Sequence, residues 1–156
     1  MAILRKDSVP LTEGVSGYPE PWNLGRGFLS YRHLTEAGGL TQFGLALETL
    51  QPGKQSSQPH WEQHEDEFLY LLDGELTVVE DGVETLIHPG DACCWKAGDP
   101  VAHTLRNHSD RPVTYLIAGS RKPENITHYP GLDLMATPSG FTHLDGSPYP
   151  KQGERE

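Results

Sequence analysis

The stretch from Pro52 to Gly74 reads PGKQSSQPHWEQHEDEFLYLLDG and holds a dense group of metal-capable side chains. His60, Glu62, His64 and Glu67 fall within eight residues of one another. An extended apolar run and the turn residues Asp73-Gly74 follow directly. This layout predicts a cluster of ligands carried at the start of a β-strand.

On both sides of this stretch, short runs of Leu, β-branched and aromatic residues alternate with Gly, Pro, Asn and Asp, a pattern typical of strands. The expected strands cover residues 28–34, 41–50, 57–62, 67–72, 75–80, 83–88, 91–96, 103–107 and 113–120. The pairs Asp73-Gly74 and Asp81-Gly82 predict two consecutive tight hairpins, because a type I′ turn needs positive φ at both central residues. No amphipathic helix of three turns is expected. The pattern favours an all-β, antiparallel sandwich or barrel of the jelly-roll kind and excludes alternating βαβ architecture.

The length of 156 residues predicts one domain. We expect an irregular N-terminal arm at 1–26, a barrel at 27–122, and a C-terminal extension at 123–156 that packs on the barrel. Fragments 125–128 and 140–143 of the extension are candidates for an added edge strand, and the last residues, from Lys151 to Glu156, are expected to fray.

The net charge of −10 and the absence of any long Lys/Arg run argue against nucleic acid and anionic membranes as partners. The N-terminus has neither a signal-peptide core nor a membrane span, so we expect a cytoplasmic protein. In such a protein the Asn-x-Ser/Thr sequons at Asn107 and Asn125 have no meaning for glycosylation.

Strand parity sorts the candidate ligands. Residues two apart in a strand share a face, so His60 and Glu62 are expected side by side. Glu67 has the opposite parity and joins them only if the chain bends or bulges between Gln63 and Asp66. A fourth ligand is expected from a facing strand, and His103, which begins a strand after a Gly-Asp-Pro turn, is the natural candidate.

The same parity argument applies to the rest of the strand after the ligands. Leu69 and Leu71 share the face of Glu67 and predict an apolar wall beside the site. Phe68, Tyr70 and Leu72 are expected on the opposite face, in sheet packing or an interface.

At these residues the chain resembles the cupins, small double-stranded β-helix barrels with two sequence motifs. The first motif, Gly-x5-His-x-His-x3–4-Glu-x6-Gly, matches at Gly53, His60, Glu67 and Gly74, with one extra residue before His60. The second, Gly-x5-Pro-x-Gly-x2-His-x3-Asn, matches at Gly90, Gly98, His103 and Asn107, with Lys96 in place of Pro and two additional residues before His103.

The resemblance implies a divalent metal (Fe, Mn, Ni or Zn) held by His60, Glu62, Glu67 and His103. Position 62 departs from the family pattern, which has His there, and this leaves three arrangements open. Glu62 ligates and makes a harder donor set that favours Mn or Fe(II), or it turns away and leaves a two-His-one-carboxylate triad. In the third arrangement His64 replaces the missing imidazole.

The family resemblance also implies the kind of function. A metal-binding cupin acting on a small-molecule substrate is expected, with either oxygenase-type or sugar isomerase/epimerase-type chemistry. Glu62, where it is not committed to the ion, is the candidate catalytic base. The alternative is a non-catalytic module that binds a small ligand or metal. Cupins also lead us to expect a homodimer.

Overall fold

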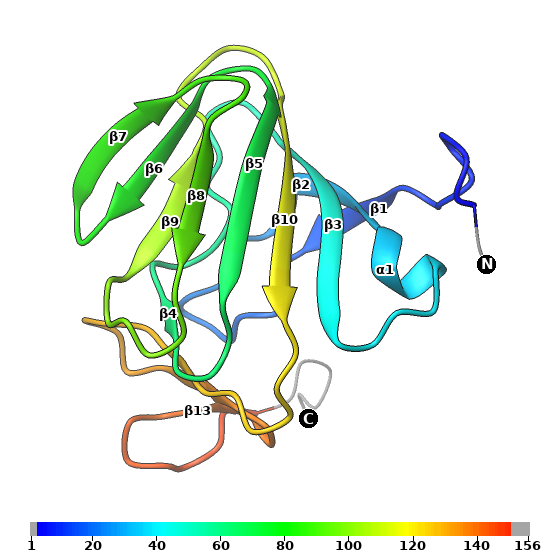
Figure 1. The fold of residues 1–156 in the computed structure, drawn as a ribbon. Helices are drawn as coiled ribbons and strands as arrows, with labels where there is room; N and C mark the ends of the chain where they lie inside the picture. The colour runs from blue at the N-terminus through cyan, green and yellow to red at the C-terminus, as the bar shows by residue number, and fades with distance from the viewer. Residues whose placement is uncertain (1–2, 151–156) are drawn as a thin grey trace.

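The computed structural model describes residues 3–150, which form an almost entirely β structure (Figure 1). A six-stranded sheet has the order β1 (Thr12–Val15), β2 (Arg26–His33), β3 (Phe43–Leu50), β10 (Val113–Ser120), β5 (Glu67–Asp73) and β8 (Ala92–Trp95). A three-stranded sheet has the order β7 (Val83–Ile87), β6 (Leu76–Glu80) and β9 (His103–Arg106). A four-stranded sheet has the order β13 (Gly140–Thr142), β12 (Met135–Thr137), β11 (Thr127–His128) and β4 (Trp61–Glu62). One short helix, α1 (Leu34–Ala37), follows β2.

The hydrophobic core lies between the six-stranded and the three-stranded sheets. The first contributes Leu50, Leu69 and Leu71, and the second contributes Leu76 and Leu105. Burial of these side chains supplies most of the driving force that holds the two sheets face to face. The sheets are not closed by a continuous ladder, but their arrangement is that of a jelly-roll barrel, which confirms the expected fold class. No helix between residues 3 and 150 has the length and apolar character needed to cross a membrane.

Eight of the nine expected strands form within about two residues of their expected ends. The exception is 57–62, where only Trp61 and Glu62 make a strand, β4. Pro59 has no N–H to donate to a ladder, which explains why regular pairing does not extend through this segment. A single bridge between His60 and His103 takes its place.

The predicted hairpin at Asp73-Gly74 is wrong. β5 pairs with β10 and β8, whereas β6 pairs with β7 and β9, so the turn carries the chain from one sheet to the other. Gly74 does have a positive φ of 92°, and a Cβ there would lie 2.9 Å from Cγ2 of Val113. Glycine is thus needed at position 74 for its positive φ and for the close approach to Val113. A turn between two sheets can have the same requirement as a hairpin, so the Asp-Gly pair does not distinguish them. The Asp81-Gly82 hairpin is confirmed, with φ of 47° and 83° between β6 and β7.

The alternation along β5 matches the parity expected from the sequence. Leu69 and Leu71 are fully buried beside Glu67, while Phe68, Tyr70 and Leu72 are exposed on the outer face.

The expected homodimer stays a prediction, because the structure contains a single chain.

Both ends of the chain contain more regular structure than expected. The arm at 1–26 includes β1, which pairs with β2 through a register shift between Glu13 and Val15. Sequence alternation could not indicate this strand, because Gly14 is its one buried residue. The C-terminal extension forms β11, β12 and β13, so its two candidate fragments do become strands. The predicted fraying of 151–156 lies outside the described residues.

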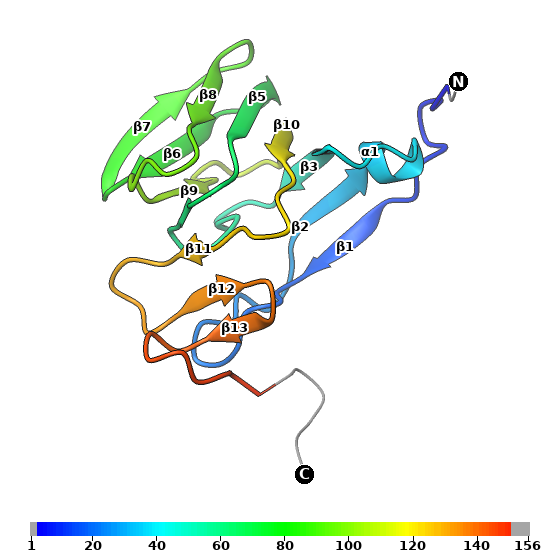
Figure 2. The ribbon, with the colours of Figure 1, turned by 60° about the horizontal axis from the view of Figure 1, so that its bottom comes forward.

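The two ends also pack on each other below the barrel (Figure 2). The indole N–H of Trp22 donates to the Tyr149 hydroxyl at 3.3 Å, and the rings of Tyr18 and Phe141 lie 5.6 Å apart. The ends therefore pack together as one layer beside the barrel.

Candidate metal centre

His60 and His103 face each other across a short antiparallel contact. The N–H of His60 donates to the carbonyl of His103 at 3.1 Å, and the reverse bond is 2.9 Å. Residues paired in this way project their side chains to the same side. As a result the two imidazole centroids lie only 4.8 Å apart.

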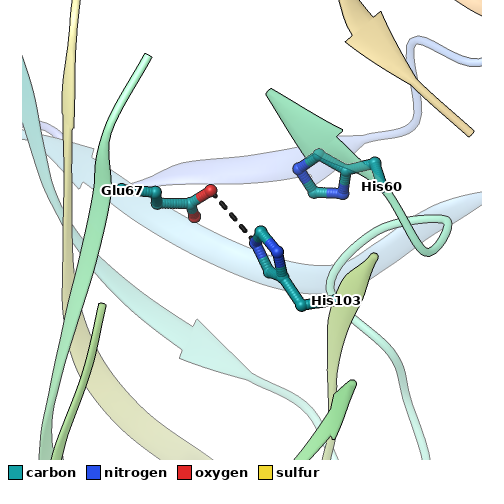
Figure 3. A group of neighbouring side chains, drawn as sticks. All are labelled: His60, Glu67 and His103. Carbon is teal, nitrogen blue, oxygen red and sulfur yellow. Dashed lines mark hydrogen bonds and ion pairs between the residues drawn. The ribbon is translucent and has the colours of Figure 1, made fainter. Parts of the chain in front are cut away.

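Glu67 is the first residue of β5, three residues after a bend in the chain at 63–64. This bend is the one that the parity argument requires, and it turns Glu67 toward the two histidines. Its Oε2 atom lies 3.2 Å from Nε2 of His103. One potential ligand atom from each of His60, Glu67 and His103 lies within 4.8 Å of the others, and the three side chains converge on one space (Figure 3). We call this group the triad.

Neighbouring groups fix the two imidazole rings. Nδ1 of His60 donates to the carbonyl of Gln58 at 2.9 Å, which leaves its Nε2 facing inward. The His103 ring stacks on Trp95, with centroids 3.9 Å apart and an interplanar angle of 8°. Nδ1 of His103 is buried and has no hydrogen-bond partner among the described residues.

Burial and charge set the protonation states of the triad. Burial lowers the pKa of His60, so its imidazole is neutral near pH 7, as metal ligation requires. Burial also raises the pKa of Glu67, but the hydrogen bond with His103 and the electrostatic interactions with His60 and His103 outweigh it and leave this pKa below its ordinary value. His60 therefore offers a neutral nitrogen and Glu67 an ionised carboxylate near neutral pH.

This donor set fits a divalent ion. Two imidazoles and one carboxylate suit Fe(II), Mn, Ni or Zn and leave further coordination positions open. Two ligand atoms bound at right angles, each about 2.1 Å from an ion, lie about 3 Å apart. The 3.2 Å between Glu67 and His103 matches this spacing, whereas the 4.8 Å limit of the triad is wider.

Glu62 lies next to the triad but is not one of the three clustered residues. Its Oε1 is 4.0 Å from Nε2 of His60. The Thr127 hydroxyl donates to Oε1 at 3.2 Å, and the Asn125 side-chain amide donates to Oε2. Burial raises the pKa of Glu62, and these two hydrogen bonds oppose the rise. Its roles as a metal ligand and as a catalytic base both stay predictions.

His64, the third option for completing the site, is exposed and lies outside the triad. Its backbone N–H donates to Asn125 at 3.0 Å, in the bend that directs Glu67 inward.

Sequence reasoning missed four residues that support the site. Asn125 and Thr127 belong to the sequon that we set aside, and their spacing of two places both on the side of Glu62. Tyr129 packs against His60 with ring centroids 5.8 Å apart, and its hydroxyl hydrogen-bonds to that of Tyr18. Asn125, Thr127 and Tyr129 are spaced two apart, which is a sequence signal that their side chains share one face of a strand. Nothing in the sequence near Tyr18 indicates that it reaches the site.

A cavity of about 500 Å³ opens beside the triad and is bounded by β3, β10 and the segment from β4 to β5. It is strongly acidic, since its described lining includes the carboxylates of Glu36, Glu48, Glu62, Glu65, Asp66 and Glu67. Arg121 is the one Lys or Arg in that described lining, and it is paired with Glu36. The cavity can hold a small molecule in contact with His60, Glu67 and Glu62.

Comparison with known proteins places these features in a family. The family model described as "Cupin domain" matches residues 46–119. No curated protein matches the sequence. A solved structure from Silicibacter pomeroyi, named as a sugar phosphate isomerase from a cupin superfamily, is 38% identical and has a TM-score of 0.87. The match covers 96% of this chain and 97% of that one.

Two further structures are more distant. A protein of Acidithiobacillus ferrooxidans, named "Putative sugar phosphate isomerase", is 26% identical with a TM-score of 0.69. The match covers 75% of this chain and 76% of that one. A predicted oxalate decarboxylase of Thermotoga maritima is 22% identical with a TM-score of 0.61, over 78% of this chain and 100% of that one, and it shows the fold alone. Because the Silicibacter protein matches along nearly its whole length and the two motifs meet at one triad, the chain belongs to the cupin superfamily.

Proposed function

We propose that the protein is a metal-dependent isomerase that moves a carbonyl group between adjacent carbons of a small sugar-like substrate. The observation that carries the proposal is the position of Glu62. This carboxylate lines the cavity beside the triad, is held from behind by Asn125 and Thr127, and lies outside the three clustered ligands. The names of the Silicibacter and Acidithiobacillus proteins point to the same class of reaction.

Carbonyl transfer between neighbouring carbons through an enediol needs a base that removes a proton from the carbon beside the carbonyl and returns a proton to the other carbon. The triad of His60, Glu67 and His103 would hold a divalent ion, which supplies a Lewis acid for the substrate oxygens. Glu62 would carry the proton between the two carbons. The layer formed by both chain ends, including Tyr18 and Tyr129, limits the access of water to His60 from that side.

The test uses protein stripped of metal by a chelator and reloaded separately with Mn, Fe(II), Ni or Zn. Each form is incubated in D2O with a panel of aldoses, ketoses and their phosphate esters, and proton NMR follows both isomer formation and deuterium uptake next to the carbonyl. We expect exchange and isomerisation with at least one metal and one sugar. Absence of both with every combination would refute the proposal.

The variant E62Q separates the two roles considered for Glu62. If the side chain acts only as the base, E62Q keeps its metal and loses proton exchange by about 10²- to 10⁴-fold. If Glu62 is a ligand, the metal content falls together with the activity. The variant E84Q is the matched control, because Glu84 lies on β7 in an ion pair with Arg106, outside the described lining of the cavity.

A second candidate is favoured by the composition of the triad itself. Two histidines and one carboxylate with open positions are typical of non-haem Fe(II) oxygenases. Oxygen uptake by the Fe(II)-loaded protein in the presence of the same panel tests this candidate. Isomerisation without any oxygen uptake would eliminate it.

A further inference from the structure

Glu48 carries a buried carboxyl group on the wall of the cavity. It is not part of the triad, and the function proposed above gives it no role. It lies on β3 directly opposite Tyr115 of β10, which in turn lies opposite Leu71 of β5. Glu67 is on the same interior face, four residues before Leu71 on β5. Glu48 therefore faces the same interior as the triad, and its residual exposure is directed into the cavity.

Among the described residues, Glu48 has a hydrogen-bond donor but no ion-pair partner. The Tyr115 hydroxyl donates to Oε2 of Glu48 at 2.8 Å. Within residues 3–150, no Lys, Arg or His nitrogen forms an ion pair with this carboxylate. The charge that acts on it across the cavity is Glu67, which has the same sign. Ala46 and Ile117 flank it on the cavity wall, and on β2 Tyr31 lies opposite Glu48 and His33 opposite Ala46, with His33 also lining the cavity.

These surroundings favour the protonated acid. Burial raises the pKa of Glu48 to about 7, the Tyr115 hydrogen bond opposes this rise, and the charge of Glu67 adds to it. A glutamine at this position would accept the same hydrogen bond without the cost of burying an ionisable group. What glutamic acid offers in addition is a proton that it can release and recover near neutral pH.

We propose that Glu48 is a second catalytic acid–base group, which transfers protons to and from the substrate oxygens while Glu62 acts on the carbons. This inference rests on the isomerase function proposed above. Two carboxyl groups line one cavity in different surroundings, Glu48 against Tyr115 and Glu62 against Asn125 and Thr127, so they can serve as separate acid and base groups.

The proposed proton transfers balance in both directions. In the first step Glu62 removes a proton from the carbon beside the carbonyl, the C–H electron pair forms a C=C bond, and the carbonyl oxygen takes the proton of Glu48. In the second step Glu48 removes the proton of the neighbouring hydroxyl, a C=O bond forms there, and the C=C electron pair takes the proton held by Glu62. Both side chains return to their starting states, and no oxidant or reductant is needed.

The experiment compares the metal-loaded parent protein with the variants E48Q, Y115F and E84Q. We expect E48Q to fold, to bind metal in full, and to lose isomerisation by about 10²- to 10⁴-fold. Deuterium exchange next to the carbonyl should fall less than isomerisation, because Glu62 is intact. Y115F keeps the acid but removes a bond that stabilises its carboxylate, so the loss of activity at high pH should move to higher pH. The control E84Q should match the parent.

A readout independent of turnover follows Glu48 directly. In protein labelled with ¹³C at the glutamate carboxyl carbons, one resonance should titrate near pH 7 in the parent and be missing in E48Q. If the parent isomerises a sugar and E48Q retains its rate within about threefold, Glu48 has no catalytic role, while the proposed function stands. If the parent acts on no sugar with any metal, the proposed function and the role of Glu48 are both wrong.

Discussion

Replacing Glu48 with glutamine should remove a large part of the pH dependence of stability between pH 4.5 and 7. In the folded protein the pKa of Glu48 is about 7, against an ordinary value of 4.5. Between these values the folded state holds a proton that the unfolded state has lost, so the free energy of unfolding falls as the pH rises. The stabilisation is complete below the unfolded pKa and is lost as the pH rises through the folded one. The difference corresponds to about 3 kcal/mol, at about 1.4 kcal/mol for each tenfold change in proton affinity.

Urea unfolding of the metal-free parent and of E48Q at a series of pH values measures this effect. Glutamine cannot ionise, so the stability of E48Q relative to the parent should rise by about 3 kcal/mol between pH 4.5 and 7.5. All other titrating groups are common to both proteins, and their contributions cancel to a first approximation. E84Q shows what the loss of a surface carboxylate does alone. A difference between E48Q and parent that stays flat with pH would mean that water reaches Glu48 freely, and the reasoning from burial would be refuted.

The other predictions concern the metal, the crossover and the substrate. H103A should lose bound divalent metal in elemental analysis after reloading, whereas H64A should keep it, because the His64 imidazole is exposed and outside the triad. G74A should lower the free energy of unfolding by about 2 kcal/mol or more, because Gly74 has a positive φ and an added Cβ would lie 2.9 Å from Cγ2 of Val113. G53A should lower it less, because Gly53 also has a positive φ but an added Cβ would have nothing within 4 Å. Free sugars should have higher kcat/KM than their phosphate esters, since the cavity is acidic and Arg121 is already paired; a tenfold preference for the esters would contradict this.

Local patterns in the sequence were sufficient for most of the barrel and for the triad. Alternation and turn residues give the strands, because the side-chain period of a strand is visible in any short window. The spacing of His60, Glu67 and His103 gives the triad, because the bend between His60 and Glu67 is marked by a polar segment. The prediction of a hairpin at Asp73-Gly74 was wrong because a local pattern indicates the backbone angle of Gly74 but not the strand with which the following residues pair.

Local sequence patterns could not identify the side chains whose partners are brought to them by long-range strand pairing. Glu48 shares the strand parity of the buried residues Ala46 and Leu50, which is a sign of a buried carboxyl, but its partner Tyr115 is set by the register between β3 and β10. Asn125 and Thr127 meet Glu62 only because β11 pairs with β4, a contact between segments more than 60 residues apart. Tertiary pairing of this kind leaves no mark in a short window of sequence.

The barrel and the ends of the chain contribute differently to the site. The segment matched by the cupin family model, 46–119, contains the whole triad and Glu48. The side chains that hold Glu62 lie outside this segment, in the C-terminal extension. The barrel segment alone therefore contains the cluster that could hold a metal, and the side chains that orient Glu62 come from the extension.

The extension also bears on whether Glu62 is a fourth ligand or a base. Hydrogen bonds to a charged group contribute about 1.5–3 kcal/mol each, so pulling Glu62 away from both Asn125 and Thr127 would cost about 3–6 kcal/mol. A base role has no such cost, because Glu62 already lines the cavity where Asn125 and Thr127 hold it, outside the three clustered residues. A ligand role would have to recover that energy from an ion already bound by His60, Glu67 and His103. The hydrogen bonds from the extension therefore favour Glu62 as the base beside a three-residue metal site.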